Sequence, residues 1–99
     1  MATKAILFRL GDVSIEKAGR KALTHQKISP MDLIVKHLCG LWGEVSDETR
    51  RRNEKAMEEG GRIVSRHPLP DGQHVLVVTT IPGSPTERGR TRLQLDSGQ

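Results

Sequence analysis

The chain has 99 residues, a formal net charge of +4 and a sequence pI near 9.7, and 34% of its residues are hydrophobic. This length allows one domain with one modest core, and the apolar fraction lies below the roughly 45–50% of average globular proteins, a figure that includes Gly. The single cysteine, Cys39, excludes an internal disulfide and a multi-cysteine zinc site. Because the sequence shows no signal segment and no run of about 18 apolar residues, we expect a cytoplasmic protein that does not enter membranes.

Aromatic residues are scarce, since the chain has one Phe, one Trp and no Tyr. The core must therefore consist of Leu, Ile, Val and Ala, which bury less area per residue. We expect marginal stability for a monomer, which a homodimer or a larger partner would raise. The basic excess lies in residues 1–29 and 61–99, around a slightly acidic segment at 30–60. Such an excess attracts nucleic acid or an acidic protein surface. Because the net charge is modest, the alternative is a basic surface that binds only solvent.

The N-terminal part predicts one weak strand and one short helix. An apolar run at 5–8 is a strand candidate, and the alternation of Val13 and Ile15 with polar residues is a second, weak strand signal. Residues 17–26 predict a short helix, although Gly19 in its interior costs about 1 kcal/mol relative to Ala.

Two further helices follow. Ser29 and Pro30 begin the first of them, with a capping hydroxyl and a proline suited to the first helical position. Its apolar face, read at helical spacing, consists of Ile34, Leu38, Leu41, Trp42 and Val45. Ser46 begins the next helix, which runs to about residue 59 and ends at Gly60 and Gly61. Opposite charges at i,i+4 pair Glu48 with Arg52, Arg50 with Glu54, and Lys55 with Glu59.

The C-terminal part predicts three strands. Residues 62–66 and the β-branched run 74–81 flank a turn at 68–72, and residues 90–95 alternate cleanly. The whole pattern indicates an α+β fold, with two to three helices packed on a small three-stranded antiparallel sheet formed by a C-terminal meander. We expect a single domain over residues 1–96 and a frayed tail at 97–99.

The segment from His37 to Ser65 resembles a family of small proteins from plasmids, prophages and other mobile elements of proteobacteria, some of which are labelled restriction–modification subunits. The family pattern is His-x-x-Gly-Asp-Trp-Gly, then an acidic helix with an Asn, then Gly-x-Arg and a strand ending in Ser. This chain matches the pattern at His37, Gly40, Trp42, Gly43, Asn53, Gly60, Arg62 and Ser65. It departs from it at Leu41, where the family has Asp, and at residues 80–85, where the family has a polar turn. The resemblance implies a mobile-element origin and no particular activity, and a polar site built from the two departing positions would be absent here.

No catalytic or metal-binding constellation stands out. His37 and Cys39 are two residues apart on a helix and so point in different directions, which argues against a nucleophile–base pair completed by Glu44. We expect Cys39 to be a small buried hydrophobe and His37 to be partly exposed. Among the four histidines, only His67 and His74 flank the same turn and are candidates for a shared zinc site, with exposed strand ends as the alternative. The sequence therefore predicts no enzyme, no metal and no cofactor.

Four residues are candidates for structural roles. We expect Trp42 to be the main aromatic anchor of the core, with an exposed binding aromatic as the alternative. Asn53 on the inner side of its helix must be hydrogen-bonded if buried, and we expect it to bind the loop at 40–46. Gly43 and Gly60 provide turns, and neither glycine pair has the spacing of a nucleotide-binding loop.

The arginines are the candidates for binding a partner. Arg90 and Arg92 share one strand face with Gln94, Arg88 lies on its approach, and Arg62 and Arg66 have the parity to extend the same face. Arg50 and Arg51 lie on the acidic third helix. An arginine-bearing sheet face can bind phosphates or carboxylates, whereas a solvated face is the alternative.

Two functional hypotheses follow. The first is a non-enzymatic mobile-element protein that binds a host protein complex, for example an inhibitor of a defence system of the anti-CRISPR or anti-restriction type. The second is a small basic DNA-binding accessory or regulatory protein. The absence of an aromatic stacking platform argues against single-strand or RNA-type recognition, and an acidic start of the third helix argues against a helix-turn-helix.

Overall fold

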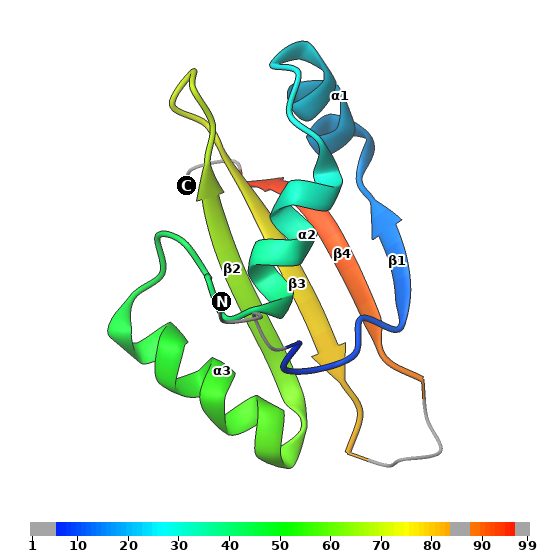
Figure 1. Ribbon diagram of the computed structural model, residues 1–99, viewed down its shortest axis with the longest axis vertical. Coiled ribbons are helices and arrows are strands. Elements are labelled where there is room, and N and C mark those ends of the chain that lie inside the picture. Colours follow the sequence, from blue (N-terminus) through cyan, green and yellow to red (C-terminus); the bar gives the residue numbers. More distant parts are fainter. Residues whose placement is uncertain (1–5, 84–87, 97–99) are drawn as a thin grey trace, which may run out of the picture.

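The computed structural model describes residues 6–83 and 88–96. Within this range the elements follow the order β1 (Asp12–Ile15), α1 (Lys17–His25), α2 (Pro30–Leu38), α3 (Asp47–Glu59), β2 (Gly61–Pro68), β3 (His74–Ile81) and β4 (Arg90–Asp96). The predicted α+β class is confirmed, and the strands form one sheet in the order β1-β4-β3-β2 (Figure 1). The predicted tail at 97–99 and residues 84 and 85 of the departing segment lie outside the described residues.

The sheet is mixed rather than purely antiparallel. The predicted meander is present, since β2 pairs antiparallel with β3 and β3 pairs antiparallel with β4. The prediction of three strands was wrong, because β1 pairs parallel with β4, with Asp12 opposite Arg90 and Ile15 opposite Leu93. Glu16 extends this contact beyond β1: its backbone N–H donates to Leu93 O at 2.8 Å, and its Oε1 accepts from Leu95 N–H at 3.0 Å.

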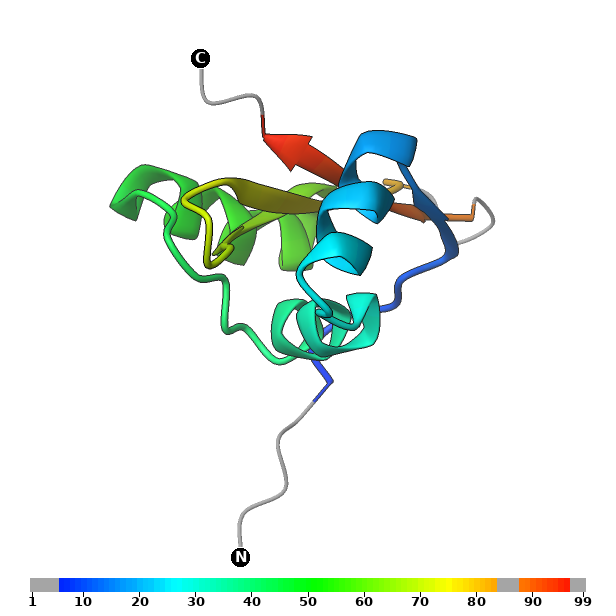
Figure 2. The same cartoon turned by 90° about the horizontal axis from the view of Figure 1, so that it is seen from above.

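The helices cover one face and one edge of the sheet. Figure 1 shows α2 in front of the sheet, α1 above it near β4, and α3 beside β2. Gly19 in α1 explains how closely this helix approaches the sheet, because a Cβ built there would lie only 3.3 Å from Leu95 N of β4. Seen from above in Figure 2, α2 lies on one side of the sheet and α3 beside its β2 edge, and no described helix lies over the middle of the opposite face.

Two apolar clusters lie between the helices and the covered face. The larger one consists of Leu23, Leu33, Ile34, Leu69, Val75, Val77 and Leu93. The smaller one, toward α3, consists of Phe8, Trp42, Ala56 and Ile63. Trp42 lies in the core as predicted, with 4% of its surface exposed, and its Nε1–H donates to His37 O at 3.2 Å.

Helix α2 is shorter than its apolar periodicity predicts. The predicted apolar face extended to Val45, but the helix ends at Leu38, and Gly40 follows with a φ of +83°. The chain then runs beside the outer edge of β2, where Arg66 N–H donates to Trp42 O at 2.9 Å and Glu44 N–H donates to Arg66 O at 2.8 Å. Trp42 and Val45 therefore reach the core from an extended segment instead of a helix, whereas Leu41, predicted on the same apolar face, is 46% exposed. None of the described helices has the length and apolar character needed to cross a membrane.

Candidate functional site

Four arginines share the sheet face that α1 and α2 leave open, which we call the open face. Arg62 of β2 lies opposite Thr80 of β3, which in turn lies opposite Arg90 of β4. One row further along the strands, Val78 of β3 lies opposite Arg92 of β4. Arg62 and Arg66 on β2, and Arg90 and Arg92 on β4, alternate with the buried residues of those two strands, which face the helices. The prediction that the arginines of β2 extend the stripe of β4 is confirmed.

Apolar side chains occupy the centre of the open face. Val64, Leu76 and Val78 project from β2 and β3 between the arginines, and only 7% of Val78 is exposed although no described helix covers it. The long side chains of the surrounding residues thus shield a small apolar floor. An apolar centre with an arginine rim differs from a uniformly cationic surface, and it is the composition found at the centres of protein–protein interfaces.

Acidic neighbours neutralise some of these arginines. Arg66 Nε donates to Asp96 Oδ2 at 2.9 Å, and its Nη1 lies 3.7 Å from Glu44 Oε1. That same Glu44 oxygen lies 2.8 Å from His74 Nε2, so the four side chains form one network at this end of the face. The network fixes the position of the Arg66 guanidinium. Because some of its N–H groups already have acidic partners, fewer remain for a binding partner.

At the β1 side of the face, ion pairs join Arg92 to Glu16 at 3.7 Å and Arg88 to Asp12 at 3.3 Å. Both pairs are exposed and so contribute little to stability. Arg62 and Arg90 form no ion pair with any residue in the described ranges. Among the described residues of the open face, these two arginines are therefore the ones without an acidic neighbour in an ion pair.

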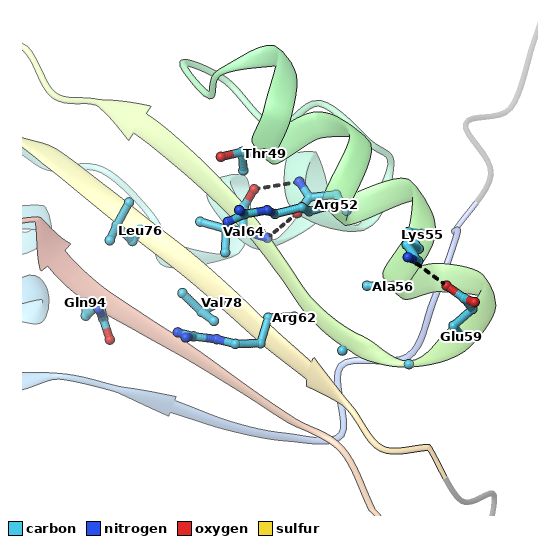
Figure 3. Close-up of a pocket in the computed structure, with 13 residues that line it drawn as sticks. Thr49, Arg52, Lys55, Ala56, Glu59, Arg62, Val64, Leu76, Val78 and Gln94 are labelled. Carbon is cyan, nitrogen blue, oxygen red and sulfur yellow. Dashed lines mark hydrogen bonds and ion pairs between the residues drawn. The ribbon is translucent and has the colours of Figure 1, made fainter.

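A groove runs between α3 and the open face, with a volume of about 470 Å³. Its lining includes Ala56, Val64 and Val78, and Arg52 of α3 and Arg62 of β2 extend along it (Figure 3). Arg62 points across Val78 in the direction of Gln94, whereas Arg52 also pairs with Glu48 at 2.6 Å. The groove thus continues the apolar floor of the open face beneath a cationic rim.

Asn53 fixes the position of α3 beside this groove. Its Nδ2 donates to Val64 O at 2.8 Å, and its Oδ1 accepts from Val64 N–H at 2.9 Å, so one side chain satisfies both groups that point away from the sheet. The expectation that Asn53 binds the loop at 40–46 was wrong, because its partner is the edge strand β2. That loop is held by its own backbone bonds to Arg66.

Gly43 and Gly60 occupy positions that a side chain would obstruct. Gly43 has a φ of +71°, and a Cβ built there would lie 2.3 Å from Arg66 O, within the bridge between the loop and β2. Gly60 has a φ of +85°, and its Cβ would lie 3.2 Å from Ile81 O. The turn roles predicted for both residues thus have a steric basis.

The arginines of α3 do not join the open face as a group. The guanidinium carbon of Arg50 lies 5.9 Å from the centre of the Trp42 ring, on the side of the loop at 40–43, and no described ion pair links Arg50 to its predicted partner Glu54. Arg51 is exposed on α3. Of the three consecutive arginines, only Arg52 lines the groove.

A buried chain of polar side chains crosses the interface between α2 and the sheet. His37 Nδ1 lies 2.7 Å from Ser65 Oγ, and its Nε2 lies 2.9 Å from Thr79 Oγ1. Ser65 Oγ also lies 2.8 Å from His67 Nε2, and Thr79 Oγ1 lies 2.7 Å from Thr91 Oγ1. At most 4% of any of these five residues is exposed. Sequence reasoning missed this chain, and the prediction of a partly exposed His37 was wrong.

With both imidazoles neutral, the bonds of this chain have one consistent direction. Thr91 donates its hydroxyl proton to Leu10 O at 2.7 Å, so it must accept from Thr79, and Thr79 must accept from His37 Nε2–H. His37 Nδ1 then accepts from Ser65, whose oxygen accepts from His67 Nε2–H. This direction places the proton of each neutral imidazole on Nε2.

Burial favours these neutral forms. Desolvation lowers the pKa of His37 from 6.5 to about 4, assisted by the nearby His67. Desolvation likewise lowers the pKa of His67 to about 4, with a further contribution from the charge of Lys36. Ser65, between the two imidazoles, has the neighbours of an activated hydroxyl but is fully buried, so no substrate reaches it.

The histidines do not converge on a metal. His67 projects to the covered face and His74 to the open face, because they occupy adjacent register positions of opposite parity in the hairpin. Throughout residues 6–83 and 88–96, no group of three His, Cys, Asp or Glu side chains has a metal-binding arrangement. The zinc alternative for His67 and His74 is therefore wrong.

No protein-family model, curated protein or solved structure matches this chain.

Proposed function

We propose that this protein acts without catalysis, by binding an acidic surface of a partner protein through the open face. The observation that carries the proposal is the apolar floor of Val64, Leu76 and Val78, bordered by Arg62 and Arg90, which form no ion pair within residues 6–83 and 88–96. Arginine combines a charged planar group with apolar area, and it is enriched where proteins bind one another. Carboxylates at the edge of a partner would pair with the arginines while its apolar side chains cover the floor.

We propose a host macromolecular complex as the partner, in keeping with the resemblance to mobile-element proteins. Occupation of a surface on a defence complex, of the anti-CRISPR or anti-restriction type, is the form of activity that a small non-catalytic protein of this kind suits. The test is an affinity capture of the tagged chain from a lysate rich in such complexes, before and after nuclease treatment. A stoichiometric partner that survives nuclease supports the proposal, whereas enrichment that disappears with nuclease contradicts it.

Duplex DNA is the alternative partner, and the arginines of β2 and β4 favour it. In that case the logarithm of the affinity falls with the logarithm of salt concentration by about 0.9 per phosphate contacted. Against it, Glu16, Glu44, Asp12 and Asp96 lie among the arginines and would repel phosphates. Lack of a mobility shift of duplex DNA at low salt and micromolar protein would exclude this alternative.

A further inference from the structure

A second cationic hollow lies on the opposite side of β2 from the open face, and it is independent of the function proposed above. Its volume is about 420 Å³, within the range of about 300–1,000 Å³ typical of small-molecule sites. The lining residues are Lys36, Gly40, Leu41, Trp42, Gly43, Arg50, His67 and Pro68. Lys36 comes from α2, Arg50 from α3 and His67 from β2, so three separate elements each bring a basic group to one place.

The acidic residue nearest in sequence turns away from this hollow. Glu44 directs its carboxylate to Arg66 and His74 on the open face. The cations of the hollow are therefore not neutralised by it, and Lys36 and Arg50 form no ion pair with a described residue. Arg50 stacks near the Trp42 ring, an arrangement that orients the guanidinium while leaving its N–H groups free to donate.

His67 supplies a hydrogen-bond acceptor to the same hollow. Only 4% of this residue is exposed, and the buried chain places its proton on Nε2, which leaves a lone pair on Nδ1. Nδ1 lies beside Gly43, which also lines the hollow, since a Cβ built on that glycine would be 3.3 Å from it. No described residue donates to Nδ1. The hollow therefore offers two cations together with one acceptor from a largely buried side chain.

We propose that this hollow binds the phosphomonoester group of a small molecule in its singly protonated form. The phosphate oxygens accept from Lys36 and Arg50, and the remaining P–OH donates to His67 Nδ1. A sulfate or a phosphodiester carries the anionic oxygens but no proton at neutral pH, so it leaves Nδ1 unsatisfied. The volume beyond the phosphate accommodates an organic substituent beside Leu41 and Pro68.

The proposal predicts a particular pH dependence. The charged and titratable groups that face His67 are Lys36 from α2, Arg50 from α3 and, through Ser65, His37. Both histidines stay neutral from pH 6 to pH 8, because burial lowers the pKa of each to about 4. The phosphate itself is the group that titrates, with a second pKa of about 6. Affinity for a phosphomonoester should thus fall by about tenfold for each pH unit above 7.

The test uses the full chain and the fluorescence of Trp42, which is the only tryptophan and lines the hollow. Ribose 5-phosphate, inorganic phosphate, sulfate and dimethyl phosphate are titrated at low ionic strength at pH 6.5 and pH 8. We expect ribose 5-phosphate to bind at pH 6.5 and to weaken at pH 8, while sulfate and dimethyl phosphate bind at least tenfold more weakly. Equal binding of sulfate, pH-independent binding, or binding of inorganic phosphate alone would each overturn the assignment.

Two variants locate the binding on the molecule. Lys36→Gln removes an exposed cation of the hollow, and we expect it to weaken ribose 5-phosphate by about tenfold or more, the usual effect of losing a charged hydrogen bond. Lys55→Gln removes an exposed cation beside the groove on the open face and should leave the affinity unchanged. Similar losses in both variants would show that the phosphate is attracted by overall charge, and would refute the site.

Discussion

Asn53 satisfies both outward-pointing backbone groups of Val64, through hydrogen bonds of 2.8 and 2.9 Å. An unprotected edge strand presents such groups to any passing strand and so invites aggregation. In this protein one carboxamide replaces the next strand at Val64, and the loop at 42–44 replaces it at Arg66. The same two contacts set α3 beside the open face, where its cations border the groove.

Replacement of Asn53 by Ala should destabilise the fold. The change leaves the N–H and C=O of Val64 without partners beneath α3, at a cost of about 2–4 kcal/mol. Urea unfolding of Asn53→Ala measures this loss. Glu54→Ala, an exposed change on the same helix, is the control and should shift the unfolding free energy by less than about 0.5 kcal/mol. Equal stabilities for the two variants would contradict the role assigned to Asn53.

Thr79→Val should reveal the contribution of the buried polar chain. Valine keeps the shape of threonine but removes the hydroxyl that accepts from His37 and donates to Thr91. We expect a loss of about 1–3 kcal/mol in the free energy of unfolding, because two buried polar groups lose a partner. Thr80→Val makes the same chemical change on the exposed face of the same strand and should be nearly neutral.

Stability should fall as the pH drops from 6.5 toward 4. His37 and His67 have pKa values of about 4 in the fold because of burial, against 6.5 in an unfolded chain. Between these values the unfolded chain binds more protons, so acid favours unfolding, by on the order of 3 kcal/mol for one such histidine at pH 4. Urea unfolding across this pH range measures the effect. The control is His25→Ala, which removes an exposed histidine and should show the same dependence of unfolding free energy on pH as the unaltered chain. A stability independent of pH between 6.5 and 4 would contradict the neutral state of the buried imidazoles.

Gly43→Ala should be much more damaging than Gly72→Ala. Both glycines have positive φ angles, +71° and +92°, so an alanine at either position carries backbone strain of about 1–2 kcal/mol. A Cβ at Gly43 would also lie 2.3 Å from Arg66 O, whereas nothing lies within 4 Å of one at Gly72. Thermal unfolding of the two variants should therefore show a clearly larger loss for Gly43→Ala, and equal losses would refute the steric account.

Much of the fold follows from local sequence signals. Ser29 and Ser46 each cap a helix, with hydroxyl oxygens 3.3 Å from Met31 N and 3.1 Å from Thr49 N. The β-branched run at 74–81 predicted β3 over its full length, and strand parity placed the arginines of β2 and β4 on one face. In these places the local pattern and the tertiary structure agree.

Two of the missed features depend on partners distant in sequence, and the third depends on the conformation of one glycine. The pairing of Asp12 with Arg90 joins the two ends of the chain, and a four-residue strand does not specify its neighbour. His37 is buried because Ser65 and Thr79 lie within hydrogen-bond distance of its ring, and no periodicity in α2 encodes that. The helix ended early because Gly40 adopts a left-handed conformation, which outweighed the apolar spacing beyond it.

The central claim is that the open face binds an acidic partner protein, and paired charge variants test it most directly. Arg62→Ala with Arg90→Ala removes the two arginines of that face that have no described ion pair, while Arg20→Ala with Lys21→Ala removes the same charge from the exposed surface of α1. The measurement is nuclease-resistant capture of a stoichiometric partner by the unaltered chain and by each variant. The account predicts that the first variant loses the partner and the second retains it. Retention by both variants, or loss by both, would contradict it.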